Sequence, residues 1–331
     1  MTKIRWAMVG TGLMADLIVR DFALCDNTEL AAIVTRSAER AFPKFAEWGI
    51  EPVTLLESLD AALADESIDL IYVAAPHSEH YWMTKAALEA GKHVLCEKAF
   101  TMNAAEAREL VALAREKGLF LMEAMWTKFN PLMNELKRRI EAGEIGELKL
   151  IETHFGFNRP YDESHRLFDA KLGGGSTLDQ GVYTTSVIDW FADSTVVSQF
   201  SRGKLYPNGT DASAVTEFHY ANGVIGVGAS ALNSTFGVTA RVSGADAYID
   251  IDGPFWTPTS ATIYRFGADD QLVAERVEVA KDGAGYSHMI REVSQSIIDG
   301  KTECAVRPLD ESIKIMGLLD EIRAQVRNAV V

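Results

Sequence analysis

The sequence predicts an α/β domain followed by an α+β domain with a large, mostly antiparallel, open-faced sheet. The chain has 331 residues and 47% of them are hydrophobic, which is enough for a core in each of two domains. As far as Glu123, short apolar runs alternate with amphipathic helical stretches. After Glu123, predicted strands follow one another between Gly, Asn and Asp turns, which is typical of antiparallel sheets. We therefore expect domains at residues 1–123 and 124–331.

The first domain reads as six strands with a helix between each pair. Residues 69–74 are almost wholly apolar, as expected of a strand that helices cover on both faces. Two of the helices end at glycines, Gly91 and Gly118. The predicted strands are 4–9, 30–35, 52–55, 69–74, 93–96 and 119–123, and the predicted helices are 13–23, 37–48, 56–64, 80–90 and 104–117. This alternation is typical of a Rossmann-type parallel sheet.

The second domain is predicted to contain a series of strands between residues 148 and 279, with helices around them. One helix precedes the strands, one interrupts them, and two close the chain. These helices are expected at residues 131–142, 175–192, 286–299 and 309–329. No repeat or low-complexity linker separates the two domains.

Composition excludes several classes of function. Acidic residues outnumber basic ones 47 to 32, so the formal charge of -15 repels nucleic acid and anionic membranes. No apolar run is long enough for a membrane span and no signal sequence is recognisable, so we expect a cytoplasmic protein. Cys25, Cys96 and Cys304 lack CxxC spacing and should be reduced. His77 and His80 have no third ligand nearby, so no metal site is predicted.

A glycine-rich turn joins the first strand to the helix that follows it. Residues 10–15 read Gly-Thr-Gly-Leu-Met-Ala. The first glycine permits the tight turn, the second lets backbone amides approach a pyrophosphate, and the alanine allows close packing of the helix on the strand. Since a helix N-terminus favours negative charge, the turn predicts a dinucleotide site; a simple connecting turn is the alternative. The predicted contacts are Gly10, Thr11, Gly12, Leu13 and Met14.

The end of the second strand indicates which dinucleotide binds. NAD-binding domains usually have Asp or Glu there for the ribose 2′-hydroxyl, but this sequence has Thr35, Arg36 and Ser37, with Arg40 one helical turn later. A guanidinium and a hydroxyl suit a 2′-phosphate, and no carboxylate repels it. The segment therefore predicts NADP(H), unless Arg36 is an ordinary solvated residue at a helix start.

Two other segments carry candidate catalytic residues. Glu97 and Lys98 follow the fifth strand, and strand C-terminal ends in such sheets face the ligand crevice, so Lys98 should point at the nicotinamide. Three glycines at 173–175 lead into a helix with Asp179 and Tyr183 at positions i and i+4. That spacing presents a carboxylate and a phenol to one site.

These motifs together resemble the glucose-fructose oxidoreductase / inositol dehydrogenase / MocA (Gfo/Idh/MocA) family over nearly the whole chain. The motifs are residues 10–15, 74–76 with His80, 90–94, 97–98 and 173–183. Segments 123–131 and 254–259 are most similar to the branch of dimeric dihydrodiol dehydrogenases and NADP-dependent D-xylose dehydrogenases. Tyr183, where many members have His, indicates the same branch.

The resemblance implies a role for each matching residue. Lys98 would contact the nicotinamide ribose and support proton transfer, Tyr183 would be the proton donor or acceptor, and Asp179 would orient substrate. Further implied cofactor contacts are Ala75, Pro76, His77, His80, Glu97 and Trp126. Implied substrate contacts are Trp126, Phe155, Trp256 and Tyr286, together with Asp179 and Tyr183, although core packing explains each aromatic residue as well.

Two positions depart from the family pattern. Ala99 follows Lys98 where the family usually has Pro, which removes the residue that makes a cis peptide bond cheap. Lys128 stands where relatives usually have Arg, so a planar bidentate contact is lost there.

The sequence as a whole predicts an NADP(H)-dependent oxidoreductase that transfers hydride to or from a sugar-like hydroxyl or carbonyl, or a trans-dihydrodiol. A keto-sugar reductase of the anhydrofructose type and a non-catalytic NADP-binding sensor are the alternatives. Retention of Lys98 and Tyr183 argues against a sensor, which needs no proton donor. Because an open sheet face needs cover, and family members pair these sheets, we expect a homodimer. The other expected partner is a substrate, a small polyhydroxy compound or a cyclic diol.

Overall fold

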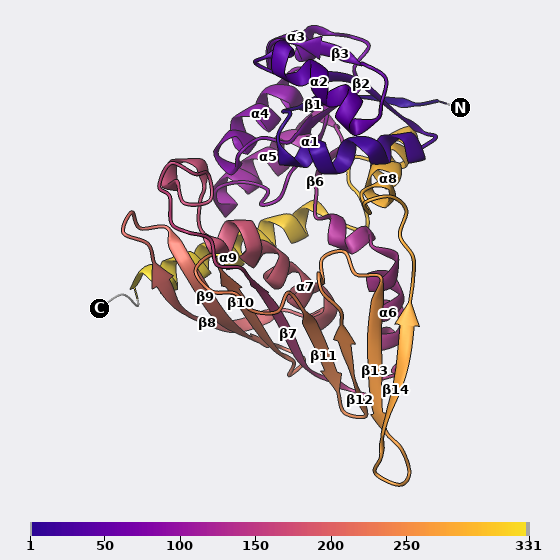
Figure 1. Ribbon diagram of the computed structural model, residues 1–331, viewed down its shortest axis with the longest axis vertical. Helices are drawn as coiled ribbons and strands as arrows, with labels where there is room; N and C mark the ends of the chain where they lie inside the picture. Colours follow the sequence, from indigo (N-terminus) through magenta and orange to yellow (C-terminus); the bar gives the residue numbers. More distant parts are fainter. Residues whose placement is uncertain (1, 329–331) are drawn as a thin grey trace. The chain divides into compact units, whose positions relative to one another are not determined.

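The computed structural model describes residues 2–328 and separates them into two compact units (Figure 1). Unit 1 runs to Trp126 and also includes Asp282–Met316. Unit 2 comprises Thr127–Lys281 and the chain from Gly317 onward. Ala329, the last residue of the predicted closing helix, lies outside the described residues.

Unit 1 is built on a six-stranded parallel sheet with the strand order β3-β2-β1-β4-β5-β6. In this order, successive strands are added to one side of β1 as far as β3 and to its other side from β4 onward, so the switch point lies between β1 and β4, where ligands bind in doubly wound sheets. The strands are β1 (Ile4–Val9), β2 (Thr28–Val34), β3 (Thr54–Leu56), β4 (Leu70–Val73), β5 (His93–Cys96) and β6 (Leu121–Glu123). All four residues of β4 are buried, which confirms the expected strand covered on both faces.

Three of the helices described in unit 1 begin at side-chain caps. Ser37, Ser58 and Asn103 each accept a hydrogen bond from a backbone amide of the helix that follows. The helices are α1 (Leu13–Ile18), the 3-10 helix η1 (Val19–Leu24), α2 (Ala38–Trp48), α3 (Leu59–Ala64), α4 (His77–Glu89), α5 (Ala104–Lys117) and α8 (Ser287–Ile298). The helix predicted at 13–23 is thus an α-helix that continues as a 3-10 helix, and α4 begins three residues earlier than predicted.

Residues 282–316 pack with the parallel sheet, which differs from a single division of the chain at Glu123. The Trp6 indole on β1 donates to Ser294 Oγ of α8 at 3.0 Å. The fully buried Arg307 guanidinium forms an ion pair with Glu123 at the end of β6 and donates to Glu311 at 2.7 Å. The bonds of Trp6 with Ser294 and of Arg307 with Glu123 join residues 288 and 184 positions apart, and no local pattern in the sequence reports them.

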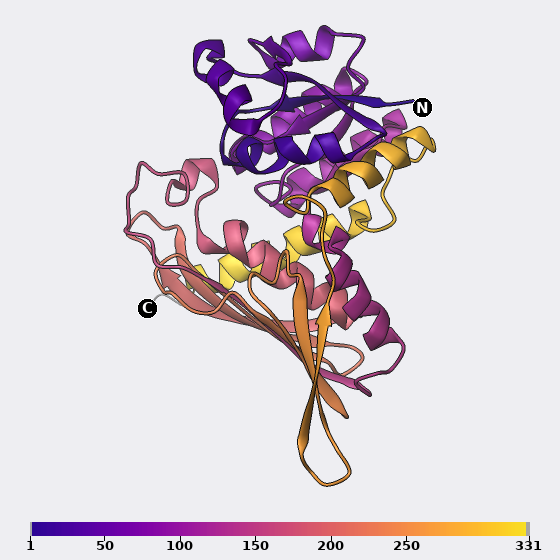
Figure 2. The same cartoon turned by 45° about the vertical axis from the view of Figure 1, so that its right-hand side comes forward.

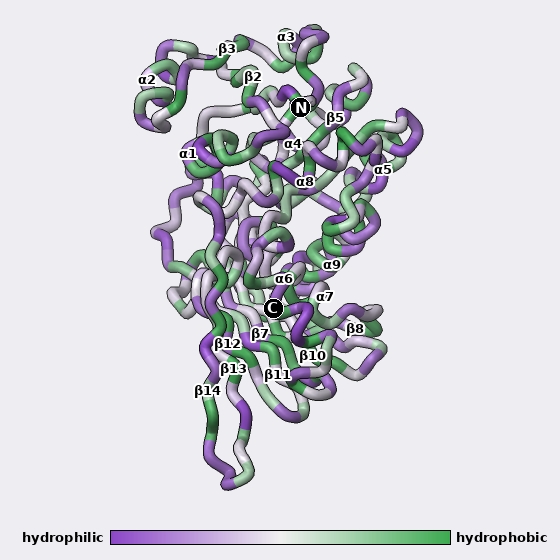
Figure 3. Tube along the Cα trace, turned by 90° about the vertical axis from the view of Figure 1, so that its right-hand side faces the viewer, coloured by the Kyte–Doolittle hydropathy of each residue, from purple (hydrophilic) through white to green (hydrophobic). Residues whose placement is uncertain are grey.

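Unit 2 contains an eight-stranded sheet with the order β14-β13-β12-β11-β7-β10-β9-β8. Only β7 and β10 pair in parallel, so the mostly antiparallel sheet is confirmed. The strands are β7 (Leu148–Gly156), β8 (Val196–Leu205), β9 (Asp211–Tyr220), β10 (Ile225–Ala231), β11 (Ala240–Gly244), β12 (Ala247–Ile251), β13 (Ser260–Phe266) and β14 (Leu272–Glu278). Hydrophilic and hydrophobic residues both occur along the β13–β14 hairpin (Figure 3). Burial alternates in the first half of β13, as expected of a strand with one buried face, whereas β14 at the sheet edge is exposed over most of its length.

The helices of unit 2 cover one face of this sheet, and among the described residues the other face carries no helix (Figure 2). The helices are η2 (Trp126–Phe129, shared at its first residue with unit 1), α6 (Pro131–Glu141), η3 (Ala170–Leu172), a π-helical turn η4 (Thr177–Gly181), α7 (Val182–Ala192) and the part of α9 (Leu309–Asn328) from Gly317 onward. Gly226 and Gly228 on β10 let Ile188 of α7 approach the strand closely.

Candidate functional site

The turn between β1 and α1 lies at the switch point of the parallel sheet. Gly10 has a φ of +114°, and a Cβ atom there would come within 2.8 Å of the Ala74 carbonyl oxygen at the end of β4. Only glycine accepts both the backbone conformation and the contact. The carboxyl ends of β1 and β4 therefore meet with backbone against backbone.

The N-terminus of α1 is left open. Gly12 is its N-cap and no side chain of the described residues caps it. Gly12 is exposed, and within residues 2–328 nothing lies within 4 Å of the position of a Cβ atom. The backbone amides of a helix start therefore point to open space, which is the arrangement that accepts a pyrophosphate.

The end of β2 places two exposed arginines after the strand. Ser37 caps α2, its Oγ accepting from the Arg40 amide at 3.4 Å, and Thr35 Oγ1 accepts from the Ser37 amide at 3.3 Å. Arg36 and Arg40 are exposed, and neither guanidinium has an ion-pair partner in the described part of the chain. The hydroxyls of Thr35 and Ser37 thus shape the turn, whereas the two guanidinium groups can meet an anion from solvent.

The segment after β5 is held by a buried carboxylate. Glu97 is 4% exposed; it accepts from the Tyr72 hydroxyl and, at 3.2 Å, from the Lys98 amide. Burial raises the pKa of Glu97 to about 7, although the bond from Tyr72 and the charge of Lys98 oppose the rise. The peptide bond between Lys98 and Ala99 is cis even without the proline usual in the family.

His80 links the ends of two strands. Its Nδ1 lies 2.9 Å from the Ala99 carbonyl and its Nε2 lies 2.9 Å from the Ala75 carbonyl. Burial lowers the pKa of this imidazole. His80 therefore fixes the backbone at Ala99, directly after Lys98, and at Ala75, directly before Pro76, the N-cap of α4. His77 packs edge-on against His80, with ring centroids 5.6 Å apart.

Trp126 and Tyr286, both in unit 1, form a stacked pair with ring centroids 4.0 Å apart. The segment that carries Tyr286 is fixed by Asp21, which is 1% exposed. One carboxylate oxygen of Asp21 accepts from the Ala284 amide at 2.9 Å, and the other from the Tyr286 and Ser287 amides at 2.8 and 3.1 Å. Asp21 thus holds the backbone of the segment that carries Tyr286 in place.

Unit 2 brings Asp179 and Tyr183 to the start of one helix. Asp179 lies in the π-helical turn η4 and Tyr183 in the first turn of α7. The Asp179 side chain is 13% exposed and accepts from Arg166 at 3.4 Å, while Tyr183 is 7% exposed. The predicted carboxylate and phenol therefore share one helical segment, with a guanidinium beside the carboxylate.

Aromatic rings surround Tyr183. Phe155 of β7 stacks on Trp256, with ring centroids 4.1 Å apart. The Tyr183 ring centroid lies 5.9 Å from that of Phe155 and 5.7 Å from that of Trp256. The six predicted substrate residues thus fall into two groups: Trp126 with Tyr286 in unit 1, and Phe155, Trp256, Asp179 and Tyr183 in unit 2.

Comparison with known proteins identifies the family. Residues 4–125 match the GFO/IDH/MocA oxidoreductase family with its NAD-binding Rossmann fold, and residues 133–250 match the C-terminal domain of that family. The chain is 30% identical to D-xylose 1-dehydrogenase (NADP(+)) of Hypocrea jecorina, covering 97% of this chain and 92% of the relative. The chain belongs to the GFO/IDH/MocA family. Its membership confirms the resemblance and the class of enzyme, an oxidoreductase.

Other relatives agree with this assignment. The chain is 29% identical to trans-1,2-dihydrobenzene-1,2-diol dehydrogenase of Bos taurus, covering 98% of this chain and 97% of the relative. The crystal structure of an aldose-aldose oxidoreductase from Caulobacter crescentus superimposes with a TM-score of 0.86 at 23% identity, covering 98% of both chains. The two-domain fold predicted from the sequence is thereby confirmed as that of this GFO/IDH/MocA family.

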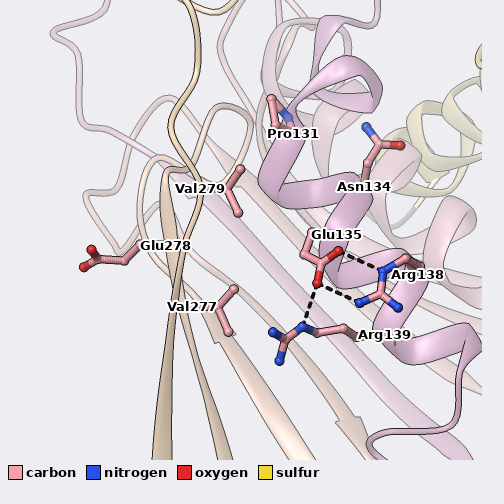
Figure 4. A pocket seen from close by; sticks show the side chains of 8 residues that line it. All are labelled: Pro131, Asn134, Glu135, Arg138, Arg139, Val277, Glu278 and Val279. Carbon is pink, nitrogen blue, oxygen red and sulfur yellow. Dashed lines mark hydrogen bonds and ion pairs between the residues drawn. The ribbon is translucent and has the colours of Figure 1, made fainter.

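A pocket within unit 2 lies elsewhere, between α6 and β14 (Figure 4). It has a volume of about 590 Å³, and Glu135 in it bonds to both Arg138 and Arg139. The residues lining it are Pro131, Asn134, Glu135, Arg138, Arg139, Val277, Glu278 and Val279, none of which was predicted to bind cofactor or substrate. Across residues 2–328, no group of three or more His, Cys, Asp and Glu side chains could hold a metal ion, and no helix is both long and apolar enough to cross a membrane.

Several residues that shape these sites gave no signal in the sequence. Asp21 reads as a polar residue at a helix end, and Tyr72 as one more residue of an apolar strand. Asp211, which accepts from the Thr177 amide at the start of η4, reads as a turn residue. Arg166 reads as one polar residue of the segment 159–166. Their partners lie 13 to 266 residues away, so only the folded chain reveals them.

Proposed function

We propose that this protein is an NADP(H)-dependent dehydrogenase or reductase acting on a sugar-like hydroxyl or carbonyl, or on a trans-dihydrodiol. The observation that carries the proposal is Tyr183, a nearly buried phenol with Asp179 on the same helical segment and Phe155 and Trp256 beside it. Aromatic faces can stack on either a sugar ring or a cyclic diol. The names of the two relatives, a D-xylose and a dihydrodiol dehydrogenase, support both substrate classes.

NADP(H) is the cofactor that the residues fit. The open N-terminus of α1 at Gly12 suits the pyrophosphate, and the exposed Arg36 and Arg40 suit a 2′-phosphate. One relative is named for NADP(+), in agreement with this choice. The remaining proposed contacts are Gly10, Thr11, Leu13, Met14, Thr35, Ser37, Ala75, Pro76, His77, His80, Glu97, Lys98 and Trp126.

The nicotinamide, when bound, supplies or accepts the hydride. We assign the matching proton to Tyr183, whose Oη gives it to, or takes it from, the substrate oxygen. Lys98 is assigned to the nicotinamide ribose. The ordinary pKa of a phenol is about 10, and the positive charge of the oxidised nicotinamide favours the ionised form of Tyr183. Asp179 orients a substrate hydroxyl, and the charge of Arg166 limits the repulsion between Asp179 and that phenolate.

We also propose a homodimer formed through the uncovered face of the eight-stranded sheet. That face carries exposed apolar side chains, including Phe200 at 61%, Val215 at 53% and Ile225 at 37% exposure. Exposed apolar side chains on an uncovered sheet face are typical of a surface that binds a partner. Light scattering at micromolar concentration should give twice the chain mass, and a monomer would refute this part of the proposal.

We further propose that the protein is located in the cytoplasm. The three cysteines are buried and free, as is usual in a reducing compartment.

The first test compares cofactor binding in wild type and Arg36→Ala. Calorimetric titration should show that wild type prefers NADPH to NADH and that the variant loses this preference, with NADPH weakened about 10- to 100-fold because charged hydrogen bonds contribute about 1.5–3 kcal/mol. NADH binding should not change. Equal affinity of wild type for both nucleotides would refute the choice of NADP(H).

The second test is turnover with NADP⁺ and either D-xylose or trans-1,2-dihydrobenzene-1,2-diol, and in the reverse direction with NADPH and a keto-sugar. Tyr183→Phe should lower kcat by about 10²–10⁴, because the phenol is the general acid or base. NADPH affinity should stay at the wild-type value. Full activity in Tyr183→Phe would remove Tyr183 from the chemistry.

A further inference from the structure

A buried carboxylate closes the start of the helical segment that carries Asp179 and Tyr183. Asp211, the first residue of β9, is 5% exposed. Its Oδ2 accepts three hydrogen bonds, from Ser176 Oγ at 2.8 Å, the Thr177 amide at 2.6 Å and Thr177 Oγ1 at 2.7 Å. Ser176, the N-cap of η4, does not cap the helix with its own side chain. Asp211 therefore takes the place of a local cap.

Glycine makes room for this carboxylate. Gly175 has a φ of +117°, and a Cβ atom there would lie 2.4 Å from Asp211 Oδ1. Its neighbour Gly174 would likewise bring a Cβ atom within 2.8 Å of the Leu167 carbonyl oxygen. The glycine-rich sequence before the helix is thus explained by contacts inside unit 2.

The charge of Asp211 is balanced by the helix and not by a cation. Within the described chain it has no ion-pair partner. An ionised carboxylate at a helix N-terminus is favoured by the backbone dipole and by charge-assisted bonds from the first amides. Ser230 on β10 donates to Ser176 at 3.2 Å, so the start of the helix is tied to two strands of the sheet.

The turn before Asp211 also holds the loop that carries Arg166. Asn208 Nδ2 donates to the Phe168 carbonyl at 2.5 Å, and the Gly175 amide donates to the Leu167 carbonyl at 2.8 Å. Arg166 in this loop donates in turn to Asp179. The segment from 206 to 211 therefore fixes both sides of the Asp179 carboxylate.

We propose that Asp211 is a positioning residue that sets the place of Asp179 and Tyr183 by closing the N-terminus of their helix. This inference rests on the proposed roles of those two residues. Displacements of about 1 Å in a catalytic group can cost about 100-fold in rate, so a carboxylate that fixes the first turn of this helix controls turnover without touching substrate.

The test compares Asp211→Asn with Asp246→Asn. Asp246 is a matched control, because its carboxylate also lies against a positive-φ glycine of unit 2, Gly146, but far from the helix in sequence and outside the network above. In Asp211→Asn, kcat with D-xylose or the dihydrodiol should fall about 10- to 100-fold while the KM and NADPH affinity stay within about twofold of wild type. Asp246→Asn should match wild type in all three.

Amide hydrogen exchange gives a readout that needs no substrate. Asp211→Asn should speed exchange at residues 177–183 at least about 10-fold over wild type, and Asp246→Asn should not. If Asp211→Asn does not fold, Thr177→Val, which removes one of the three donors, should show the same changes to a smaller degree. A purely structural role predicts a lower unfolding temperature with an unchanged kcat per NADPH-binding site, and that result, or unchanged exchange, would overturn the proposal. If wild type turns over none of the substrates, the proposed function fails, and exchange still decides the role of Asp211.

Discussion

Two helices of this chain begin at glycine-rich segments, and their beginnings are built in opposite ways. At α1 the N-cap is Gly12, and in the described residues no side chain reaches the first amides. At η4, which continues as α7, the carboxylate of Asp211 fills the corresponding place. In both segments a glycine lets another group approach the backbone closely. At Gly10 this group is a backbone carbonyl, and at Gly175 it is a carboxylate.

The difference shows that a glycine-rich helix start is not by itself an anion site. A helix N-terminus attracts an anion only if the protein does not supply one of its own. In unit 1 the open start is left for the cofactor in our proposal. In unit 2 the closed start holds side chains of the helix in place. The sequence pattern of glycines before a helix is common to both.

Converting the open start into a closed one should give the largest effect. We expect Gly12→Asp to lower NADPH affinity about 1,000-fold, because two unit charges about 4 Å apart repel by about 4 kcal/mol at an effective dielectric constant of about 20. The substitution should fold, since residues 2–328 leave the space beside Gly12 empty and its φ is -83°. Calorimetry with NADPH measures the loss.

Gly12→Asn is the control for that experiment. It adds a capping side chain of the same shape without the charge, so it separates capping from repulsion. We expect Gly12→Asn to bind NADPH more tightly than Gly12→Asp. Wild-type affinity in Gly12→Asp would show that the cofactor does not approach this helix start.

The open start could be predicted from the sequence, but the closed one could not. The turn at Gly10 lies between a strand and a helix that are adjacent in the chain, so local patterns contain the needed information, and the parallel sheet was predicted for the same reason. Asp211 acts on Ser176 across 35 residues, and Asp21 on Tyr286 across 265. Hydrogen bonds between residues so far apart in the chain depend on tertiary packing, and no local pattern in a single sequence predicts them.

The same difference between local motifs and distant contacts explains which residues of the candidate site could be predicted. Lys98, Asp179 and Tyr183 were assigned through motifs whose residues lie close together in the sequence, and the structure agrees that Asp179 and Tyr183 share a helical segment. The supports around them, Tyr72 and Arg166, are single residues without a motif. The roles of the site residues themselves stay predictions until the variants above are measured.

A buried carboxylate away from any helix start should behave differently, and Glu97 tests this. Burial raises its pKa to about 7, above the ordinary value of 4.5. Between pH 4.5 and 7 the unfolded chain loses this proton while the folded chain keeps it, so stability is full below pH 4.5 and falls as pH rises to 7. Glu97→Gln should remove this loss, which amounts to up to about 3 kcal/mol between pH 5 and 8.

Denaturant unfolding of wild type and Glu97→Gln at pH 5 and pH 8 measures that effect. Other groups titrate in both proteins, including the buried His80, so only the difference between the two proteins reports Glu97. The difference in the free energy of unfolding between Glu97→Gln and wild type should shift in favour of the variant from pH 5 to pH 8. The same pH dependence in both proteins would mean that Glu97 is ionised in the folded protein throughout this range.

A third helix start, that of α8, extends the comparison with the smallest expected effect. Asp21 accepts from the amides of Ala284, Tyr286 and Ser287, so this start is closed by a carboxylate as in unit 2. Asp21→Asn should lower the free energy of unfolding by about 1–2 kcal/mol, because an amide group cannot accept all three bonds. The control Asp65→Asn changes a surface carboxylate that accepts only from Ser67, where water can replace it, and should leave the unfolding midpoint nearly unchanged. If both variants unfold alike, the carboxylate at α8 is not needed to close the helix, and the closed start in unit 2 must then be judged by Asp211 alone.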